Sequence, residues 1–150
     1  MFIFLLIGHD VFAVAFWNGL SNDCTTVAVG NYTTGTGIQN GTNGCWTLSY
    51  VNANPGDYIN VQIYYHNTSN ITATNTRLIL NTNGGSSTNH SFTGQIVSDQ
   101  ASTPIQTVTV HIPTSQNLTF DASYWYPNQT TGQNNAIVSY SPTILNGGLN

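Results

Sequence analysis

The chain has almost no charge. It contains no lysine and no glutamate, and charged residues make up 4% of its 150 positions, against about 25% in an ordinary soluble domain. Its only strong cation is Arg77, and its only carboxylates are Asp10, Asp23, Asp57, Asp99 and Asp121. One arginine cannot neutralise a phosphate backbone or form a basic membrane patch, so we expect no nucleic-acid partner. Low charge suits either self-association or a surface adapted to an outside environment.

Cysteine is also scarce, which excludes a fold built on many disulfides. The two cysteines, Cys24 and Cys45, enclose a segment rich in Gly, Thr and Asn. In an exported protein such a pair predicts one disulfide, worth about 3 kcal/mol by loop closure. A two-thiol metal site is the alternative, although neither a CxxC motif nor a nearby histidine supports it.

The sequence motifs of catalysis and metal binding are missing. The histidines are scattered, with no pair at i,i+4 spacing and no accompanying carboxylate cluster, and the aspartates form no DxDxDG calcium loop. No GxSxG elbow is present, and glycoside hydrolysis would need two aspartates that have no supporting context. We therefore expect no catalytic residue, no metal site and no cofactor. The histidines are His9, His66, His90 and His111.

No apolar run is long enough to span a bilayer. Residues 1–15 are apolar but are interrupted by Gly8-His9-Asp10, and no Lys or Arg precedes them. Ala13-Val14-Ala15 fits the small-x-small pattern before a signal-peptidase cut, which predicts a mature start at Phe16 or Trp17. Two hypotheses follow for residues 1–15: a signal peptide that lacks its basic beginning, or a retained N-terminal strand. Residues 16–150 are expected to form a single domain, secreted or held at the cell surface.

What the sequence does have is a period-two alternation around residues 58–66. Asn54-Pro55-Gly56-Asp57 predicts a turn, with Gly56 at the positive-φ position. After it, one face of the expected strand carries Ile59, Val61, Ile63 and Tyr65, and the other face carries Tyr58, Asn60, Gln62, Tyr64 and His66.

Further strands are expected at similar spacing, and no segment has sustained helical periodicity. Residues 81–90 are expected to be a polar loop, and Pro104 and Pro113 are expected to bracket a strand. Eight or nine short strands predict an all-β fold, an antiparallel β-sandwich. The other expected strands cover residues 17–20, 25–29, 46–51, 71–80, 92–98, 107–112 and 117–126, and residues 136–140 and 143–145 together form a last strand.

A family resemblance rests on the same central stretch. Pro55-Gly56-Asp57, the alternating strand ending in Asn67-Thr68, and Thr72-Ala73-Thr74-Asn75 resemble a motif of the immunoglobulin-like conserved-repeat and cell-adhesion-related domains. These domains belong to bacterial and archaeal surface proteins. Ser69 stands where that family often has glycine. The resemblance implies an immunoglobulin-like sandwich, export, and a structural or adhesive role, and it carries over no catalytic residue.

Asparagine sequons and exposed aromatics are the remaining candidate sites. Tyr124-Trp125-Tyr126 places Trp125 opposite its neighbours on a strand, so a large ring is expected to face a second copy of the chain or a glycan. Sequons are weak evidence for glycosylation, because Asn, Ser and Thr are so abundant that several arise by chance. They lie at Asn31, Asn40, Asn67, Asn70, Asn89, Asn117 and Asn128.

Two functions remain open from the sequence. The favoured one is a non-enzymatic extracellular structural protein that forms a filament or matrix with copies of itself, by donating a terminal apolar strand to a neighbour. The alternative is a carbohydrate- or surface-binding adhesion module that uses its exposed aromatics. Residues 136–145 are one candidate donor strand, and the other contains Val11, Phe12, Val14, Phe16 and Trp17.

Overall fold

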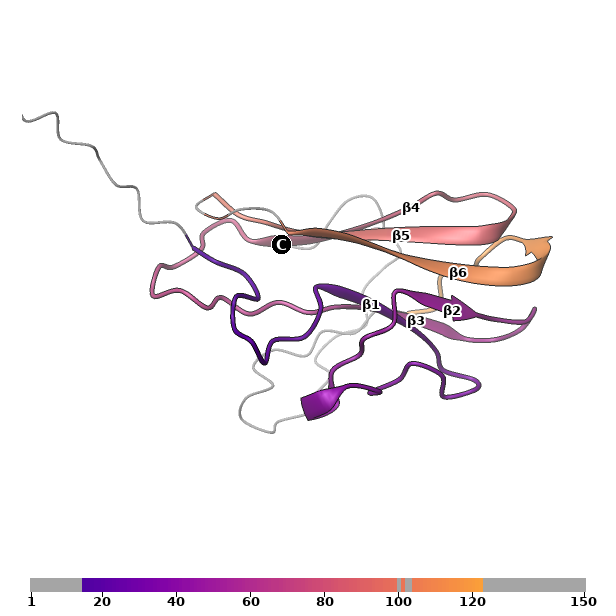
Figure 1. Cartoon of the computed structure of the whole chain (residues 1–150). Helices are drawn as coiled ribbons and strands as arrows, with labels where there is room; N and C mark the ends of the chain where they lie inside the picture. The colour runs from indigo at the N-terminus through magenta and orange to yellow at the C-terminus, as the bar shows by residue number, and fades with distance from the viewer. Residues whose placement is uncertain (1–14, 100, 102–103, 123–150) are drawn as a thin grey trace, which may run out of the picture.

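The computed structural model describes residues 15–99, 101 and 104–122. Within them the chain is all-β, as predicted, with almost no helix (Figure 1). The strands are β1 (Val27–Asn31), β2 (Tyr50–Asn52), β3 (Ile59–Ile63), β4 (Arg77–Thr82), β5 (Ser87–Val97) and β6 (Ile105–Gln116), and a short 3-10 helix, η1, covers Thr42–Gly44.

The strands form two sheets. One contains β1 and β3, paired antiparallel, and the other has the order β2-β6-β5-β4. Strand β5 is antiparallel to both of its neighbours, β4 and β6, but β2 runs parallel to β6, with Val51 opposite Val110. The expectation of wholly antiparallel pairing is therefore wrong for β2. No tight hairpin joins β2 to β6, so the connection between them does not impose an antiparallel direction.

The two sheets enclose a common core (Figure 1). Strands β5 and β6 alternate buried and less buried residues along most of their length, which is the period expected when one face packs against a second layer. Ile59, Val61 and Ile63 of β3 pack against the core, so the inward face predicted for this strand is confirmed. The buried core residues are Val27, Val29, Val51, Ala53, Phe92, Val108, Val110 and Ile112.

Polar contacts also join the sheets. The side-chain oxygen Oε1 of Gln106, on β6, accepts hydrogen bonds from the Thr25 hydroxyl (2.7 Å) and from the N–H of Val27 (3.1 Å). On the opposite side, the carbonyl of Leu48 accepts from Val29 of β1, and the carbonyl of Ser49 accepts from Thr109 of β6. The segment that leads into β2 therefore bonds to both sheets and closes this side of the core.

The expected loop at residues 81–90 is largely strand. Strands β4 and β5 form a hairpin in which Gly84 (φ 59°) and Gly85 (φ 69°) occupy the turn. Glycine adopts positive φ values readily, so this pair allows the chain to turn between the two strands. The prediction failed because the flanking strand residues, such as Asn89 and Ser91, are polar and give no apolar alternation.

Other strand boundaries also differ from the predictions, and residues 17–20 do not form a strand. Strand β4 begins at Arg77 and not at Ile71, because Asn75 has φ 51° and interrupts the extended conformation. Pro113 lies within β6, in the irregular stretch between the pairs His111–Asn89 and Gln116–Ser87, where the ladder does not need its missing N–H. Residues 117–122 are not strand. The last expected strand, at 136–140 and 143–145, lies outside the described residues.

The predicted disulfide is present. Cys24 and Cys45 are bonded, with their Cα atoms 5.3 Å apart. The bridge ties the segment that enters β1 to the loop that leads toward β2, so it closes a covalent loop that contains β1 and the polar residues after it.

Candidate functional site

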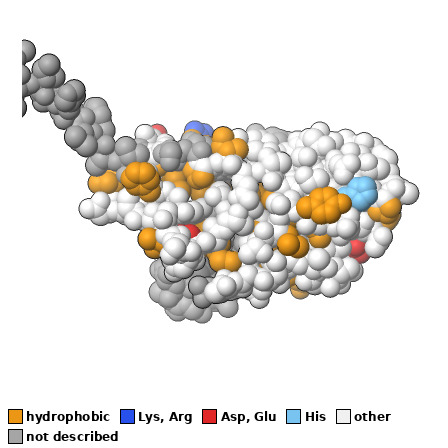
Figure 2. Space-filling view, in the orientation of Figure 1, with side chains coloured by type: hydrophobic (Ala, Val, Ile, Leu, Met, Phe, Trp, Pro, Cys, Tyr) orange, Lys and Arg blue, Asp and Glu red, His pale blue; other side chains and the backbone are white. Residues whose placement is uncertain are grey.

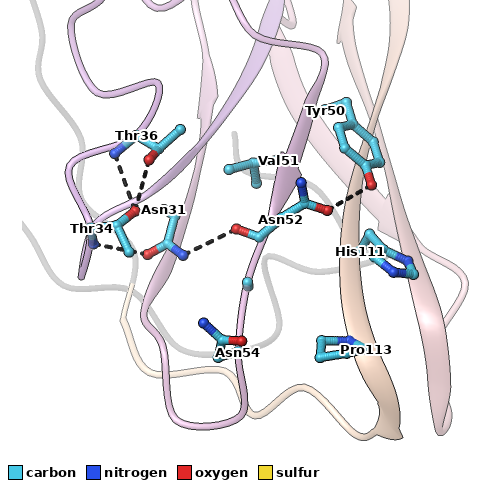
Figure 3. A pocket seen from close by; sticks show the side chains of 10 residues that line it. Asn31, Thr34, Thr36, Tyr50, Val51, Asn52, Asn54, His111 and Pro113 are labelled. Atoms are coloured by element: carbon cyan, nitrogen blue, oxygen red, sulfur yellow. Dashed lines mark hydrogen bonds between the residues drawn. The ribbon is translucent and has the colours of Figure 1, made fainter.

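The described surface contains a groove of about 550 Å³ at the side where β2 joins the two sheets (Figure 3). Its walls come from the end of β1 and the loop after it, from β2 and the residues that follow it, and from β6. None of the lining residues is Asp, Glu, Lys or Arg. The lining consists of Asn31, Thr34, Thr36, Tyr50, Val51, Asn52, Ala53, Asn54, His111 and Pro113.

Asn31 organises the floor of this groove. Its side chain is 1% exposed, and its amide nitrogen donates to the carbonyl of Asn52 (3.2 Å) and to the Asp57 carboxylate (2.8 Å). Its oxygen accepts from the N–H of Thr34 (3.2 Å). Both the nitrogen and the oxygen of this buried amide are hydrogen bonded, so the side chain resists reorientation: each lost bond would leave a buried polar atom without a partner. The end of β1 is thereby fixed against β2 and the following turn.

The turn after β2 has the conformation predicted from Pro55-Gly56-Asp57. Gly56 has φ 94°, and the N–H of Asp57 donates to the carbonyl of Asn54 (3.0 Å). The Asp57 carboxylate accepts from the N–H of Asn54 (2.9 Å) as well as from Asn31, and these two bonds lower its pKa against a smaller opposing effect of burial. The turn is thus closed by its own side chain.

Tyr50 forms the aromatic wall of the groove. Its side chain is 48% exposed, and its hydroxyl donates to Oδ1 of Asn52 (2.8 Å) (Figure 3). The alternation in the sequence does not say which face of residues 46–51 is buried. The structure buries Val51 and leaves Tyr50 outside. Sequence reasoning missed Tyr50 as a contact residue, and the available signal was that Val51 and Ala53 supply a small apolar face opposite it.

The other lining side chains with polar groups add hydrogen-bonding atoms to the groove. The ring nitrogen Nδ1 of His111 is hydrogen bonded to Oδ1 of Asn89 (3.0 Å), so Nε2 is the ring nitrogen that remains for a ligand. The Thr34 hydroxyl donates to that of Thr36 (2.9 Å). The side-chain amide of Asn54 has no hydrogen bond to another described residue. The groove therefore combines one aromatic ring with neutral donors and acceptors.

A second polar cluster lies at the far end of β3. The sequence shows no carboxylate cluster beside His66, but the fold brings one carboxylate to it: Nδ1 of His66 is 2.7 Å from Oδ1 of Asp23. The Tyr64 hydroxyl donates to the same oxygen (3.0 Å), and the N–H of Leu20 donates to Oδ2 (2.8 Å). No sequence pattern predicts this contact, because Asp23 and His66 lie on separate segments.

Burial and hydrogen bonding together set the ionisation of this cluster. Burial alone would raise the pKa of Asp23, but the bonds from His66, Leu20 and Tyr64, together with the charge of His66, lower it overall. Burial, the bond to Asp23 and its negative charge raise the pKa of Tyr64 to about 12. Among the described residues, no hydroxyl or thiol is hydrogen bonded to the His66 ring. The cluster is therefore best explained as a structural clamp.

That clamp holds the N-terminal segment on its own domain. The Asn18 side chain donates to the Tyr64 carbonyl (3.0 Å) and accepts from the N–H of His66 (2.8 Å). The donor-strand candidates Phe16 and Trp17 lie beside it. Phe16 is 58% exposed, and its carbonyl accepts a hydrogen bond from the N–H of Thr68. Trp17 forms an isolated antiparallel β-bridge with Asn67. The candidates Val11, Phe12 and Val14 lie outside the described residues.

The sequons differ in accessibility. Asn31 is buried and its amide is fully used, so a glycan attached there is incompatible with this fold. Asn67 is half-buried, and its amide donates to the Ile71 carbonyl (2.7 Å). The exposed sequons are Asn40, Asn70, Asn89 and Asn117. Asn128 and the aromatic candidates Tyr124, Trp125 and Tyr126 lie outside the described residues.

The described part of the chain has neither a metal-binding cluster nor a membrane-spanning helix. It contains no group of three or more His, Cys, Asp or Glu side chains placed to hold a metal ion. It also contains no helix with the length and apolar character needed to cross a membrane. Comparison of the chain with models of protein families, with curated proteins and with solved structures gives no match.

Proposed function

We propose that this protein is a non-enzymatic, secreted structural protein of the cell surface, and that its copies assemble into a filament or matrix. The two sheets around one core, the single disulfide and the resemblance of residues 54–75 support an immunoglobulin-like sandwich in an exported protein. Figure 2 shows a surface made largely of uncharged polar groups, with few charged side chains. Such a surface offers little electrostatic repulsion between copies.

The observation that carries the proposal is the outer edge of β3. Tyr64 donates its N–H to Thr26, and Tyr32 donates its N–H to Tyr58, which marks these residues as the hydrogen-bonded pairs of the β1–β3 ladder. In an antiparallel ladder the intervening residues direct their backbone groups the other way. The backbone N–H and C=O groups of Ile59, Val61 and Ile63 therefore point away from β1.

No described strand pairs with this outer edge. The side chains of Ile59, Val61 and Ile63 are partly buried against the core. This edge therefore has unpaired backbone groups and, beside them, apolar side chains that are only partly covered. Both features suit the addition of a strand from another segment. The proposed occupant is the apolar segment of a neighbouring copy that contains Val11, Phe12 and Val14.

The attachment of residues 16–20 sets the limits of the donated segment. Ala15 is fully buried and forms an isolated parallel β-bridge with Ala101. Phe16 and Asn18 are hydrogen bonded to Thr68 and His66, in the segment that follows β3 of the same chain. We therefore place the donor before Ala15 and leave Phe16 and Trp17 with the domain that carries them. A donor on one side of a domain and an acceptor edge on another give a head-to-tail contact that does not close, and hence a filament.

Electron microscopy and size-exclusion chromatography of the full chain test the proposal. We expect filaments or large oligomers, and we expect removal of residues 1–14 to give monomers. Val61→Pro should also give monomers, since it removes an N–H that the β1–β3 ladder does not use. Circular dichroism checks that this variant is folded. A full chain that stays monomeric at high concentration, or assembly that survives both changes, refutes N-terminal donation.

N-terminal sequencing of the native protein separates the two readings of residues 1–15. A start at Met1 or shortly after it keeps the proposed donor in the mature chain. A start at Phe16 or Trp17 supports export by a cleaved signal peptide and rules out Val11, Phe12 and Val14 as donors. In that case residues 136–145 become the donor to be deleted in the same assembly assay.

A further inference from the structure

The groove beside Tyr50 has a chemistry that the proposed structural role does not use. It offers one exposed aromatic ring, several neutral hydrogen-bonding groups and no charged side chain. Its volume of about 550 Å³ falls within the range of about 300–1,000 Å³ that is typical of ligand sites. We propose that this groove binds a neutral oligosaccharide.

The aromatic wall is held in a fixed position. The hydroxyl of Tyr50 donates to Asn52 Oδ1 at 2.8 Å, and both residues lie on β2, whose backbone pairs with β6. The ring is therefore restrained at its base by the sheet and at its tip by a hydrogen bond. Little conformational entropy is lost when a ligand packs on a ring that is already restrained. The apolar C–H face of a sugar is a suitable partner for such a ring.

The polar groups around the ring are suited to sugar hydroxyls, which both donate and accept hydrogen bonds. Asn52 uses its Oδ1 to hold Tyr50, which leaves its amide N–H groups to donate. The Asn54 side chain offers a donor and an acceptor, and His111 offers Nε2, because its Nδ1 is bonded to Asn89. Figure 3 shows Tyr50 and His111 on one side of the groove and Asn54 at its lower end.

The missing charges define the class of ligand. A phosphate, sulfate or uronic acid would need a cation, and the lining contains no Lys or Arg. A mainly apolar ligand would leave the amides of Asn52 and Asn54 without partners in the complex. A neutral polyhydroxylated ligand satisfies both conditions, because each hydroxyl can replace a water on these groups while the ring covers a C–H face.

The test uses the full chain with four neutral probes: maltotetraose, cellotetraose, mannotetraose and chitotetraose. Isothermal titration calorimetry should give saturable binding of at least one of them. In ¹⁵N-labelled protein, that probe should shift the side-chain amide signals of Asn52 and Asn54. Hyaluronan tetrasaccharide, which carries carboxylates, should not bind. If none of the four neutral probes binds, the proposal is wrong.

Variants locate the site. Tyr50→Ala should weaken binding about tenfold, the order expected when one aromatic contact with a sugar ring is lost. Tyr50→Phe keeps the ring and should retain most of the affinity. Tyr58→Ala removes a ring that is 60% exposed but lies outside the lining, so its affinity should equal that of the wild type. Equal affinity of Tyr50→Ala and wild type, or an equal loss in Tyr58→Ala, would place binding elsewhere and overturn the proposal.

Discussion

The buried amide of Asn31 donates a hydrogen bond to the carboxylate of Asp57, with 2.8 Å between Nδ2 and Oδ2. This contact joins the last residue of β1 to the turn that precedes β3. The same amide holds the carbonyl of Asn52 at the end of β2. One side chain thus joins the end of β1 to the end of β2 and to the turn that follows it, and residues of all three segments line the groove.

We predict that Asn31→Ala lowers the free energy of unfolding by about 2 kcal/mol, because it removes hydrogen bonds made by a buried side chain and leaves their partners without replacements. Urea unfolding followed by circular dichroism measures the change. Asn70→Ala is the matched control, since Asn70 is exposed, and it should change the stability by less than about 0.5 kcal/mol. Equal effects of the two substitutions would contradict the role given to Asn31.

Acid should destabilise the protein through Asp23 and Asp57. The pKa of each carboxyl is lowered in the folded state below the ordinary value of 3.8. A lowered folded-state pKa means that the carboxylate contributes stability above the unfolded-state pKa and loses it as the pH falls through the folded-state value. We therefore expect the melting temperature to fall steeply as the pH drops below about 4.

Substitution separates the two contributions to acid unfolding. Asp23→Asn and Asp57→Asn should each be less stable than wild type at pH 7, and each should show a shallower fall in melting temperature between pH 4 and pH 2. Asp121→Asn is the control, because Asp121 is exposed and makes no hydrogen bond to a described residue. Its acid profile should match that of the wild type, and identical slopes in all four proteins would show that neither carboxylate is responsible.

Local patterns predicted part of this fold well. The all-β class, the disulfide, the Pro55-Gly56-Asp57 turn and the inward face of β3 follow from alternation, spacing and turn chemistry, and each is confirmed. These features depend on residues that are close in sequence or, for the disulfide, on the only two cysteines of the chain. A positive φ at glycine or a period of two has few structural explanations, so sequence patterns of this kind are reliable.

Pairing and contacts between distant segments could not be predicted in the same way. The parallel pairing of β2 with β6, the contact of Asp23 with His66 and the groove beside Tyr50 all depend on how separate segments meet. Polar strands were missed for another reason. In β5 and at the end of β6, Asn, Ser and Thr occupy exposed positions of true strands, and they are also the residues that favour turns.

The disulfide should contribute measurably to stability. We predict that the double variant Cys24→Ser/Cys45→Ser loses about 3 kcal/mol in the free energy of unfolding, since the bridge restricts the unfolded chain over this loop. Urea unfolding gives the value. Reduced wild-type protein should unfold at the same urea concentration as the double variant. Unchanged stability after reduction would mean that the loop is held equally well by its other contacts.

Gly94 of β5 lies close to both strands of the facing sheet. A Cβ atom at this position would overlap Cγ2 of Val27 on β1 and lie 3.3 Å from Cγ1 of Ile63 on β3. We predict that Gly94→Ala destabilises the protein by about 1–3 kcal/mol, because the added methyl group must separate two sheets that share a packed core. Urea unfolding measures the loss.

A double-mutant cycle tests whether steric overlap is the cause. Val27→Ala removes the side-chain atom that the new methyl group would meet. Introduced alone, this substitution leaves a cavity and is itself destabilising. The combined variant Gly94→Ala/Val27→Ala should therefore lose less stability than the sum of the two single losses. If steric overlap is the cause, the two substitutions should show a favourable coupling energy. Additive losses would instead assign the effect of Gly94→Ala to the backbone of β5 and not to the distance between the sheets.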